Sequence, residues 1–166
     1  MKIYYASSIR GVHSKDKSFY DQKIVEHLLH FGVVLGGSII NGEFNPFGDF
    51  NLSEKSIHDR EVDWIIDSDA VIAEVTNPSL GVGYIIGRAV EHGRKILCLY
   101  RQTPNKLSTM IIGSKNIKLV EYKNPDELFG MIDEFVGKLK IKLDKARTIS
   151  DVNKSAFHDL ITGKIN

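Results

Sequence analysis

Residues 69–90, DAVIAEVTNPSLGVGYIIGRAV, contain the pattern that decides the fold. Asp69–Val75 is a largely apolar run, which is typical of a strand buried on both faces of a sheet. Thr76–Leu80 is a tight connection, and Gly81–His92 is predicted to be a helix that Gly93 ends. A buried strand that passes directly into a helix is the unit from which parallel α/β sheets are built.

Four more apolar runs flank this unit, and amphipathic stretches separate them. The predicted strands are Lys2–Ala6, Val33–Leu35, Lys95–Tyr100 and Ile117–Tyr122, and the predicted helices are Asp16–Phe31, one from the N-cap Ser53 to about Asp67, a short turn near Ser108–Ile112, and Pro125 to about Val136. Gly36–Asn51 is predicted to be a loop. This alternation predicts an α/β fold in which a five-stranded parallel sheet carries helices on both faces. Ligands bind such sheets at the carboxyl ends of the strands.

The length of 166 residues and the mass of 18.7 kDa suit one globular domain. We predict a folded domain over residues 1–137 and a polar, lysine-rich extension over residues 138–166. Apolar residues recur in the extension at a spacing that allows one more amphipathic helix.

Composition argues against several functional classes. Lys and Arg number 22 and Asp and Glu number 21, so the net charge of +1 gives no electrostatic reason to expect binding to a nucleic-acid polymer. No apolar run approaches the roughly 20 residues of a membrane span, and the short apolar start does not resemble a signal peptide. The single cysteine, Cys98, precludes an intrachain disulfide and fits a reducing, cytoplasmic compartment. The six histidines are scattered, so we expect neither a metal site nor a cofactor.

The segment Asn77–Tyr84 (NPSLGVGY) is the strongest candidate for a binding site. Ser79 supplies a hydroxyl, and the backbone N–H groups near Gly81 and Gly83 lie at the positive end of the predicted helix, which attracts anions. A phosphate site is one interpretation. The other is that these residues only turn the chain and let helix and sheet pack closely.

A second polar segment, Ser7–Gly11 (SSIRG), follows the first predicted strand. Its two hydroxyls and Arg10 suit recognition of a phosphate or of sugar hydroxyls. The alternative is a serine-capped turn beside a solvated arginine.

Glu61 has unusual surroundings for a carboxylate. It shares one stripe of its predicted helix with the apolar residues Ile57, Trp64 and Ile65. A carboxylate among apolar neighbours is costly unless it is paired or used in chemistry. Glu61 is therefore either a catalytic group, with His58 nearby, or a rim residue paired with Arg60 or Lys55.

Five segments of the sequence resemble, in the same order, the 2′-deoxynucleoside 5′-monophosphate N-glycosidases, which are hydrolytic relatives of the nucleoside 2-deoxyribosyltransferases. The segments are Lys2–Gly11 (KIYYASSIRG), Ile57–Ile65 (IHDREVDWI), Asp69–Val90, Arg94–Tyr100 (RKILCLY) and Ser108–Ile111 (STMI). The resemblance spans about residues 1–136. It implies a flavodoxin-like (Rossmann-like) three-layer sandwich, a homodimer, and hydrolysis of the bond between base and sugar in a nucleoside 5′-monophosphate.

The resemblance also implies roles for individual positions. It makes Tyr4 an active-site tyrosine, and it puts Glu61 in the place of an aspartate that assists chemistry near the sugar and the base. The substrate-binding residues that it implies are Ser8, Ile9, Arg10 and Gly11 in the first loop, Ser79 and Gly81 in a phosphate-binding turn, and Ser108 and Met110, which the partner subunit adds to the site.

One position departs from the family pattern. Ile85, in the string Tyr84-Ile85-Ile86-Gly87, stands where the family has its catalytic glutamate, and isoleucine can neither attack the anomeric carbon nor stabilise its positive charge. One hypothesis is an N-glycosidase with altered chemistry, in which Glu61 acts as general base or electrostatic stabiliser. Another is an inactive nucleotide-binding pseudoenzyme that serves as sensor or scaffold. A third is that residues 138–166 recruit a partner or tighten an oligomer.

Overall fold

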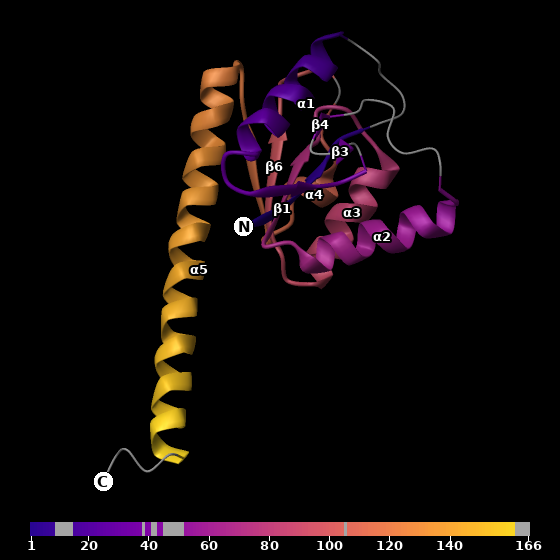
Figure 1. Ribbon diagram of the computed structural model, residues 1–166. Helices are drawn as coiled ribbons and strands as arrows, with labels where there is room; N and C mark the ends of the chain where they lie inside the picture. Colours follow the sequence, from indigo (N-terminus) through magenta and orange to yellow (C-terminus); the bar gives the residue numbers. More distant parts are fainter. Residues whose placement is uncertain (9–14, 38, 41–42, 45–51, 105, 162–166) are drawn as a thin grey trace. The chain divides into compact units, whose positions relative to one another are not determined.

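The computed structural model describes residues 1–8, 15–37, 39–40, 43–44, 52–104 and 106–161 (Figure 1). The strands of its main sheet, all parallel, are β1 (Lys2–Ala6), β2 (Val33–Leu35), β5 (Ala70–Glu74), β6 (Lys95–Tyr100) and β7 (Ile117–Glu121). Their spatial order is β2-β1-β5-β6-β7. Counted along the chain, this is the 2-1-3-4-5 order of flavodoxin-like sheets. The predicted five-stranded parallel α/β fold is confirmed.

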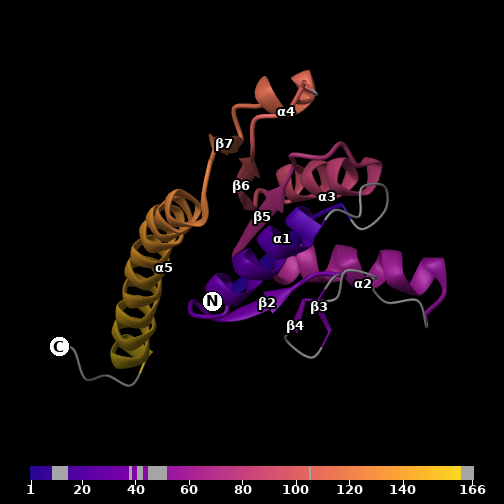
Figure 2. The same ribbon diagram turned by 90° about the horizontal axis from the view of Figure 1, so that it is seen from above.

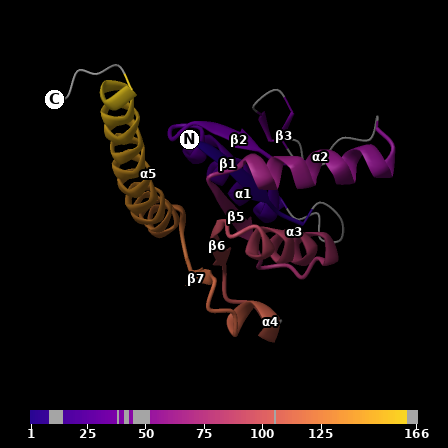
Figure 3. The same cartoon turned by 90° about the horizontal axis from the view of Figure 1, so that it is seen from below.

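Helices cover both faces of the sheet. The helices of the described chain are α1 (Lys15–Leu28), α2 (Glu54–Asp67), α3 (Leu80–Glu91), α4 (Thr109–Ile112) and α5 (Pro125–Ile161), of which α5 belongs to the sheet-bearing unit only up to Ile132. Helices α2 and α3 run side by side over one face (Figures 2 and 3). Helix α1 and the first turns of α5 lie together over the other face, where the rings of His27 and Phe129 stack with their centroids 4.4 Å apart. In the described part of the chain, no helix combines the length and the apolar character that a membrane span requires.

The alternation of side chains along β1 decides what reaches each helical layer. Tyr4 and Ala6 belong to the apolar core beneath α2 and α3. Tyr5, between them, faces the opposite layer and donates a hydrogen bond to Asp21 of α1. Because Ala6 pairs with Ala73 of β5, the two central strands end side by side, and the segments that follow them meet at one edge of the sheet.

Serine caps start both helices of the α2–α3 layer. The Ser53 hydroxyl accepts a hydrogen bond from the backbone N–H of Ser56 at 3.2 Å, as the sequence predicts. The Ser79 hydroxyl accepts one from the backbone N–H of Val82 at 3.4 Å, so α3 begins at Leu80, one residue earlier than predicted. Ser79 is thus fixed at the positive end of α3.

Two regions differ from the sequence prediction. The predicted loop Gly36–Asn51 contains a short antiparallel pair, β3 (Ile39–Ile40) with β4 (Glu43–Phe44), in which β-branched and aromatic residues favour extended backbone. Helix α5 does not end near Val136 but continues to Ile161. No proline interrupts this stretch, and its leucines, lysines and alanines are good helix formers.

The chain divides into two compact units, Met1–Ile132 and Asp133–Asn166. The boundary predicted at 137/138 and the boundary between the units both fall within α5. In the second unit the described residues are helical, and Ile141 and Ile149 are exposed.

Candidate functional site

The carboxylate of Glu61 is held from two sides. The Tyr4 hydroxyl donates a hydrogen bond to Glu61 Oε2 at 2.5 Å, and Arg60 Nη2 donates to Oε1 at 3.0 Å. The Glu61 side chain is 14% exposed, so the pair is neither sealed in the core nor free in solvent. Arg60 in turn lies over the Trp64 ring, with its guanidinium carbon 4.6 Å from the ring centroid. Of the two alternative partners that the sequence suggests for Glu61, Arg60 is the one in contact.

Tyr4 contributes a neutral hydroxyl to this array. Its side chain is 1% exposed, and burial together with the neighbouring Glu61 raises the pKa of Tyr4 well above its usual value. The phenol therefore keeps its proton at physiological pH, and the hydrogen bond runs from tyrosine to carboxylate.

Gly37 leaves room for the Glu61 carboxylate. A Cβ atom built on Gly37 would lie 3.2 Å from Glu61 Oε1, closer than ordinary van der Waals contact. A side chain at position 37 would press on the carboxylate. The glutamate thus fits beside a residue that has no side chain.

A pocket of about 570 Å³ opens at the start of α3. Its walls come from residues 75–80, 82–84, 86, 106–108, 110 and 111, and its polar lining side chains include Thr76, Asn77, Ser79, Tyr84, Lys106 and Ser108. The pocket therefore combines the N-terminus of a helix, hydroxyl groups and one cation. These are the groups that bind a phosphate monoester.

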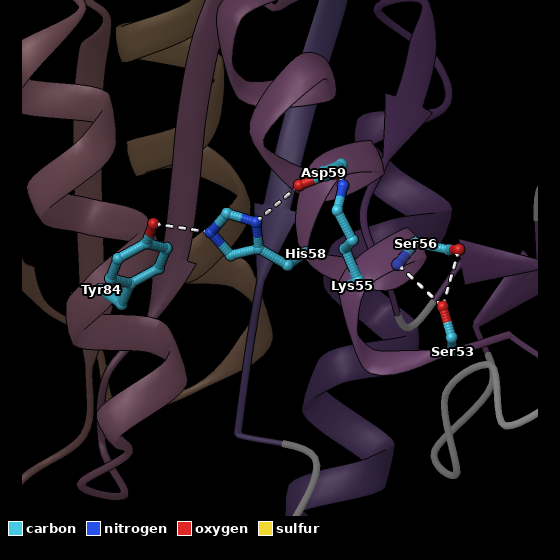
Figure 4. Close-up of polar contacts among 6 residues, drawn as sticks. All are labelled: Ser53, Lys55, Ser56, His58, Asp59 and Tyr84. Carbon is cyan, nitrogen blue, oxygen red and sulfur yellow. Dashed lines mark hydrogen bonds and ion pairs between the residues drawn. The ribbon is translucent and has the colours of Figure 1, made fainter.

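A chain of hydrogen bonds joins α2 to this pocket (Figure 4). His58 Nδ1 lies 3.0 Å from Asp59 Oδ1, and His58 Nε2 lies 2.8 Å from the hydroxyl of Tyr84, which lines the pocket. Lys55 forms an ion pair with Asp59. Sequence analysis noted His58 only as a neighbour of Glu61, because its contact with Tyr84 depends on how α2 and α3 pack.

The structure brings some of the sequence-predicted residues together. Tyr4 contacts Glu61, while Ser79, Ser108 and Met110 line one pocket. Among the described residues, the lining of this pocket includes neither Tyr4 nor Glu61.

The other predicted positions surround these two groups. Ser8 is 4% exposed just after β1, and Gly81 is exposed in the first turn of α3. Ile9, Arg10 and Gly11 lie outside the described residues. Lys106 is a site residue that sequence analysis missed, because a lysine in an irregular segment carries no distinguishing signal.

Ile85 offers no polar group at its position on α3. Its side chain is half-buried and packs against the apolar core that includes Tyr4 and Ile65. The carboxylate that contacts Tyr4 on this side of the sheet is that of Glu61 on α2.

Comparison with known proteins identifies relatives along most of the chain. No protein-family model matches the sequence. A Nematostella vectensis protein, provisionally named 2′-deoxynucleoside 5′-phosphate N-hydrolase 1, is 44% identical over 131 residues, which are 75% of this chain and 87% of the relative. The 5-hydroxymethyl-dUMP N-hydrolase of Danio rerio is 41% identical over 138 residues, which are 81% of this chain and 95% of the relative.

Solved structures share the fold at low sequence identity. The solution structure of BlsM matches with a TM-score of 0.63 and 16% identity, over 86% of this chain and 93% of BlsM. The CMP N-glycosidase BcmB of Clostridium botulinum matches with a TM-score of 0.57 and 18% identity, over 80% of this chain and 98% of BcmB. The fold, and above all the identity to curated relatives, agree with the resemblance seen in the sequence. The chain belongs to the family of 2′-deoxynucleoside 5′-phosphate N-hydrolases.

Proposed function

We propose that the protein hydrolyses the bond between base and sugar of a nucleoside 5′-monophosphate, with Glu61 as the catalytic carboxylate. The observation that carries this proposal is the array in which Tyr4 and Arg60 hold Glu61 at the edge of the core. The names of the relatives describe hydrolysis of such nucleotides. A cytoplasmic location suits the proposal, because Cys98 is a buried free thiol.

Cleavage of an N-glycosidic bond passes through a transition state with positive charge on the sugar. The Glu61 carboxylate stabilises that charge and accepts a proton from the attacking water, as electrostatic stabiliser and general base. Tyr4 keeps the carboxylate in place through its hydrogen bond to Oε2. Because Ile85 occupies the place of the family nucleophile, this reaction proceeds without a covalent intermediate at that position.

Substrate binding is assigned to two segments at the carboxyl ends of β1 and β5. Ser79 and Gly81, at the positive end of α3, bind the phosphate of the nucleotide. Ser8 and the residues Ile9, Arg10 and Gly11 complete the binding site from the loop after β1. The assignment of these four residues rests on the family resemblance.

The protein is further proposed to be a homodimer in which Ser108 and Met110 complete the site of the partner subunit. Apolar side chains are unusually exposed beside the pocket, with Leu80 96% and Met110 80% exposed. Exposed apolar surface of this kind marks contact surfaces. Sedimentation of the wild type and of Met110→Asp tests this assembly, and a monomeric wild type contradicts it.

The decisive experiment for the proposed function measures free base released from a panel of deoxyribo- and ribonucleoside monophosphates. We expect wild-type protein to release base from at least one of them, and Glu61→Gln to lose that activity. Glu54→Gln, an exposed position on the same helix, is the matched control and retains it. Unchanged turnover in Glu61→Gln contradicts the assignment.

A second candidate function is binding of a nucleoside monophosphate without cleavage, and Ile85 is the observation that favours it. This function predicts thermal stabilisation by nucleotide with no product. A ligand concentration ten times the Kd adds about 1.4 kcal/mol to the free energy of unfolding. Absence of any melting shift with every monophosphate tested excludes this candidate.

Replacing Ile85 by glutamate separates the two candidates further. If the remaining site is intact, Ile85→Glu creates or raises hydrolysis, because it restores a carboxylate at the place of the family nucleophile. Ile85→Gln, which lacks the negative charge, is the control. An Ile85→Glu variant that binds nucleotide but gains no hydrolysis shows that the pocket differs from the family's at further positions.

A further inference from the structure

The hydrogen-bonded chain Asp59–His58–Tyr84 is not used by the function proposed above. Each link is within hydrogen-bonding distance, at 3.0 Å between Asp59 and His58 and 2.8 Å between His58 and Tyr84 (Figure 4). A hydroxyl beside an imidazole that a carboxylate orients is the arrangement that proteins use to move a proton to or from a ligand. Because Tyr84 also lines the pocket, this chain ends where a ligand would bind.

The hydrogen bonds to Asp59 and Tyr84 define which ring nitrogens of His58 carry a proton. A carboxylate can only accept, so Nδ1 carries the hydrogen in the contact with Asp59. Nε2 then either accepts the hydroxyl proton of Tyr84, when His58 is neutral, or donates to the Tyr84 oxygen, when His58 is protonated. In the second state the Tyr84 O–H is free to donate to a ligand. His58 therefore controls whether Tyr84 offers the ligand a proton.

Asp59 is an ionised carboxylate at the end of the hydrogen-bonded series that lies away from the pocket. Hydrogen bonds from Lys55 and His58 hold the pKa of Asp59 below its usual range. Within the described part of the chain, His58 contacts two ionisable groups, Asp59 on its own helix and Tyr84 on α3, and Lys55 pairs with Asp59. Glu61, three residues further along α2, is the next acidic group on the same side of the helix.

The separations of two residue pairs, Ser79–Tyr84 along α3 and His58–Glu61 along α2, connect these hydrogen bonds to the proposed reaction. Tyr84 is five residues beyond Ser79, which is about 7.5 Å along α3. A nucleotide with its phosphate at Ser79 reaches about this far with its sugar. On α2, His58 and Glu61 are three residues apart and so are neighbours on the helix surface. Tyr84 thus lines the same pocket as Ser79, and its hydroxyl contacts His58, which neighbours Glu61 on the surface of α2.

We propose that Tyr84 is the catalytic residue that gives a proton to the departing base, and that His58 and Asp59 are the positioning residues that resupply it. This inference rests on the proposed hydrolase function. In the step, the C1′–N bond breaks and its electron pair goes to the base, which takes the proton of the Tyr84 O–H. The Nε2–H proton of His58 replaces it on the Tyr84 oxygen. Water forms the new bond to C1′ and passes its proton to Glu61.

The test compares two substrates that differ in how much the leaving base needs a proton. dUMP releases uracil, and 5-fluoro-dUMP releases the more acidic 5-fluorouracil. Proton delivery by a side chain contributes about 100-fold to such reactions. We expect Tyr84→Phe and His58→Gln to lower kcat for dUMP by about that factor, and for 5-fluoro-dUMP by much less. Asp59→Asn has a smaller effect in the same direction, and Asp63→Asn, an exposed acid on the same helix, has none.

The ratio of the two kcat values gives a readout that loss of structure alone would not move. A variant that is only loosely folded loses the same factor on both substrates, whereas loss of proton delivery raises the ratio of kcat for 5-fluoro-dUMP to kcat for dUMP. Measurements of melting temperature and of dUMP affinity serve as controls that the variants are folded and bind the nucleotide.

Two results overturn the inference in distinguishable ways. If wild type hydrolyses both nucleotides and Tyr84→Phe or His58→Gln loses the same factor on each, then proton delivery by Tyr84 and His58 is wrong and the hydrolase function stands. If wild type binds dUMP but releases no base from any nucleotide of the panel, the proposed function fails and the proton-delivery role fails with it.

Discussion

Two adjacent residues of β1 make the same hydrogen bond on opposite faces of the sheet. Tyr4 donates to Glu61 at 2.5 Å beneath α2, and Tyr5 donates to Asp21 at 2.6 Å beneath α1. Both tyrosines are 1% exposed, and burial raises the pKa of each well above its usual value. The two phenols are therefore equivalent donors, and the difference lies in their carboxylates.

The Asp21 carboxylate is sealed, whereas the Glu61 carboxylate has access to solvent. Asp21 is 0% exposed and lies near Glu74, itself 2% exposed, which accepts hydrogen bonds from Thr76 and Tyr122. Glu61 is 14% exposed and borders Gly37, which has no side chain to cover it. The buried Tyr5–Asp21 pair therefore has a structural role, because ligands cannot reach it. The Tyr4–Glu61 pair is a candidate site, because its carboxylate has access to solvent.

Removing the two carboxylates should have opposite consequences, and these are the largest effects that we predict. Glu61→Gln lowers base release by at least about 100-fold, since it removes the catalytic charge, and changes the free energy of unfolding by less than about 1 kcal/mol, since glutamine keeps an acceptor oxygen for the Tyr4 hydroxyl. Asp21→Ala lowers the free energy of unfolding by about 3 kcal/mol, because the buried Tyr5 hydroxyl loses its charged acceptor. Urea unfolding and a base-release assay measure both quantities. Loss of activity in both variants with equal loss of stability would remove the distinction between the structural pair and the candidate site.

The two tyrosines sharpen the same comparison at a smaller scale. Tyr4→Phe lowers kcat by about 10-fold, because the Glu61 carboxylate loses the donor that positions it. Tyr5→Phe leaves kcat unchanged and lowers the free energy of unfolding by about 2 kcal/mol, because Asp21 stays buried without that donor. Kinetics and unfolding of both variants in one buffer test this. An activity loss confined to Tyr5→Phe contradicts it.

The sealed side should also show a pH dependence of stability. Burial raises the pKa of Glu74 above the unfolded value of 4.5, and nearby Asp21 adds to the rise. The protonated form is favoured in the folded state, so this contribution to stability is full below pH 4.5 and is lost as the pH rises through the folded-state pKa. A folded-state pKa that lies one pH unit above the unfolded-state pKa contributes about 1.4 kcal/mol to the free energy of unfolding.

Glu74→Gln tests this dependence, because it keeps an acceptor oxygen and removes the ionisation. Urea unfolding between pH 4 and pH 8 should show a flatter profile for the variant than for the wild type. Parallel profiles would mean that Glu74 ionises without cost in its buried position.

The smallest predicted effect concerns the space beside Glu61. In Gly37→Ala the new Cβ lies 3.2 Å from Glu61 Oε1 and displaces the carboxylate, which lowers kcat by less than about 10-fold. The double variant with Glu61→Asp relieves the contact, so the cost of the alanine is smaller there. A cost that is equal in both backgrounds argues against this steric account.

Sequence patterns predicted the strands and helices well where apolar periodicity is strong. The buried strand and helix within 69–90 and the cap at Ser53 arise from local preferences that the sequence displays directly. The apolar spacing of residues 138–166 indicates a possible helix, but it does not indicate that this helix is continuous with the one that begins at Pro125.

The contacts within the candidate site were harder to predict. Glu61 and Tyr4 were both candidates, but their hydrogen bond joins residues 57 positions apart, and sequence spacing does not reveal such a pairing. The contact between His58 and Tyr84 depends on the packing of α2 against α3. Local propensity says nothing about either contact.

The central claim is that Glu61 acts on the sugar, and a crystal structure with a bound nucleoside 5′-monophosphate tests it most directly. We expect the phosphate to lie at Ser79. We expect the anomeric carbon C1′ to lie within about 3.5 Å of a Glu61 carboxylate oxygen or of a water molecule bound to that carboxylate. A nucleotide whose C1′ lies against Ile85, with the Glu61 carboxylate out of reach, would contradict the account.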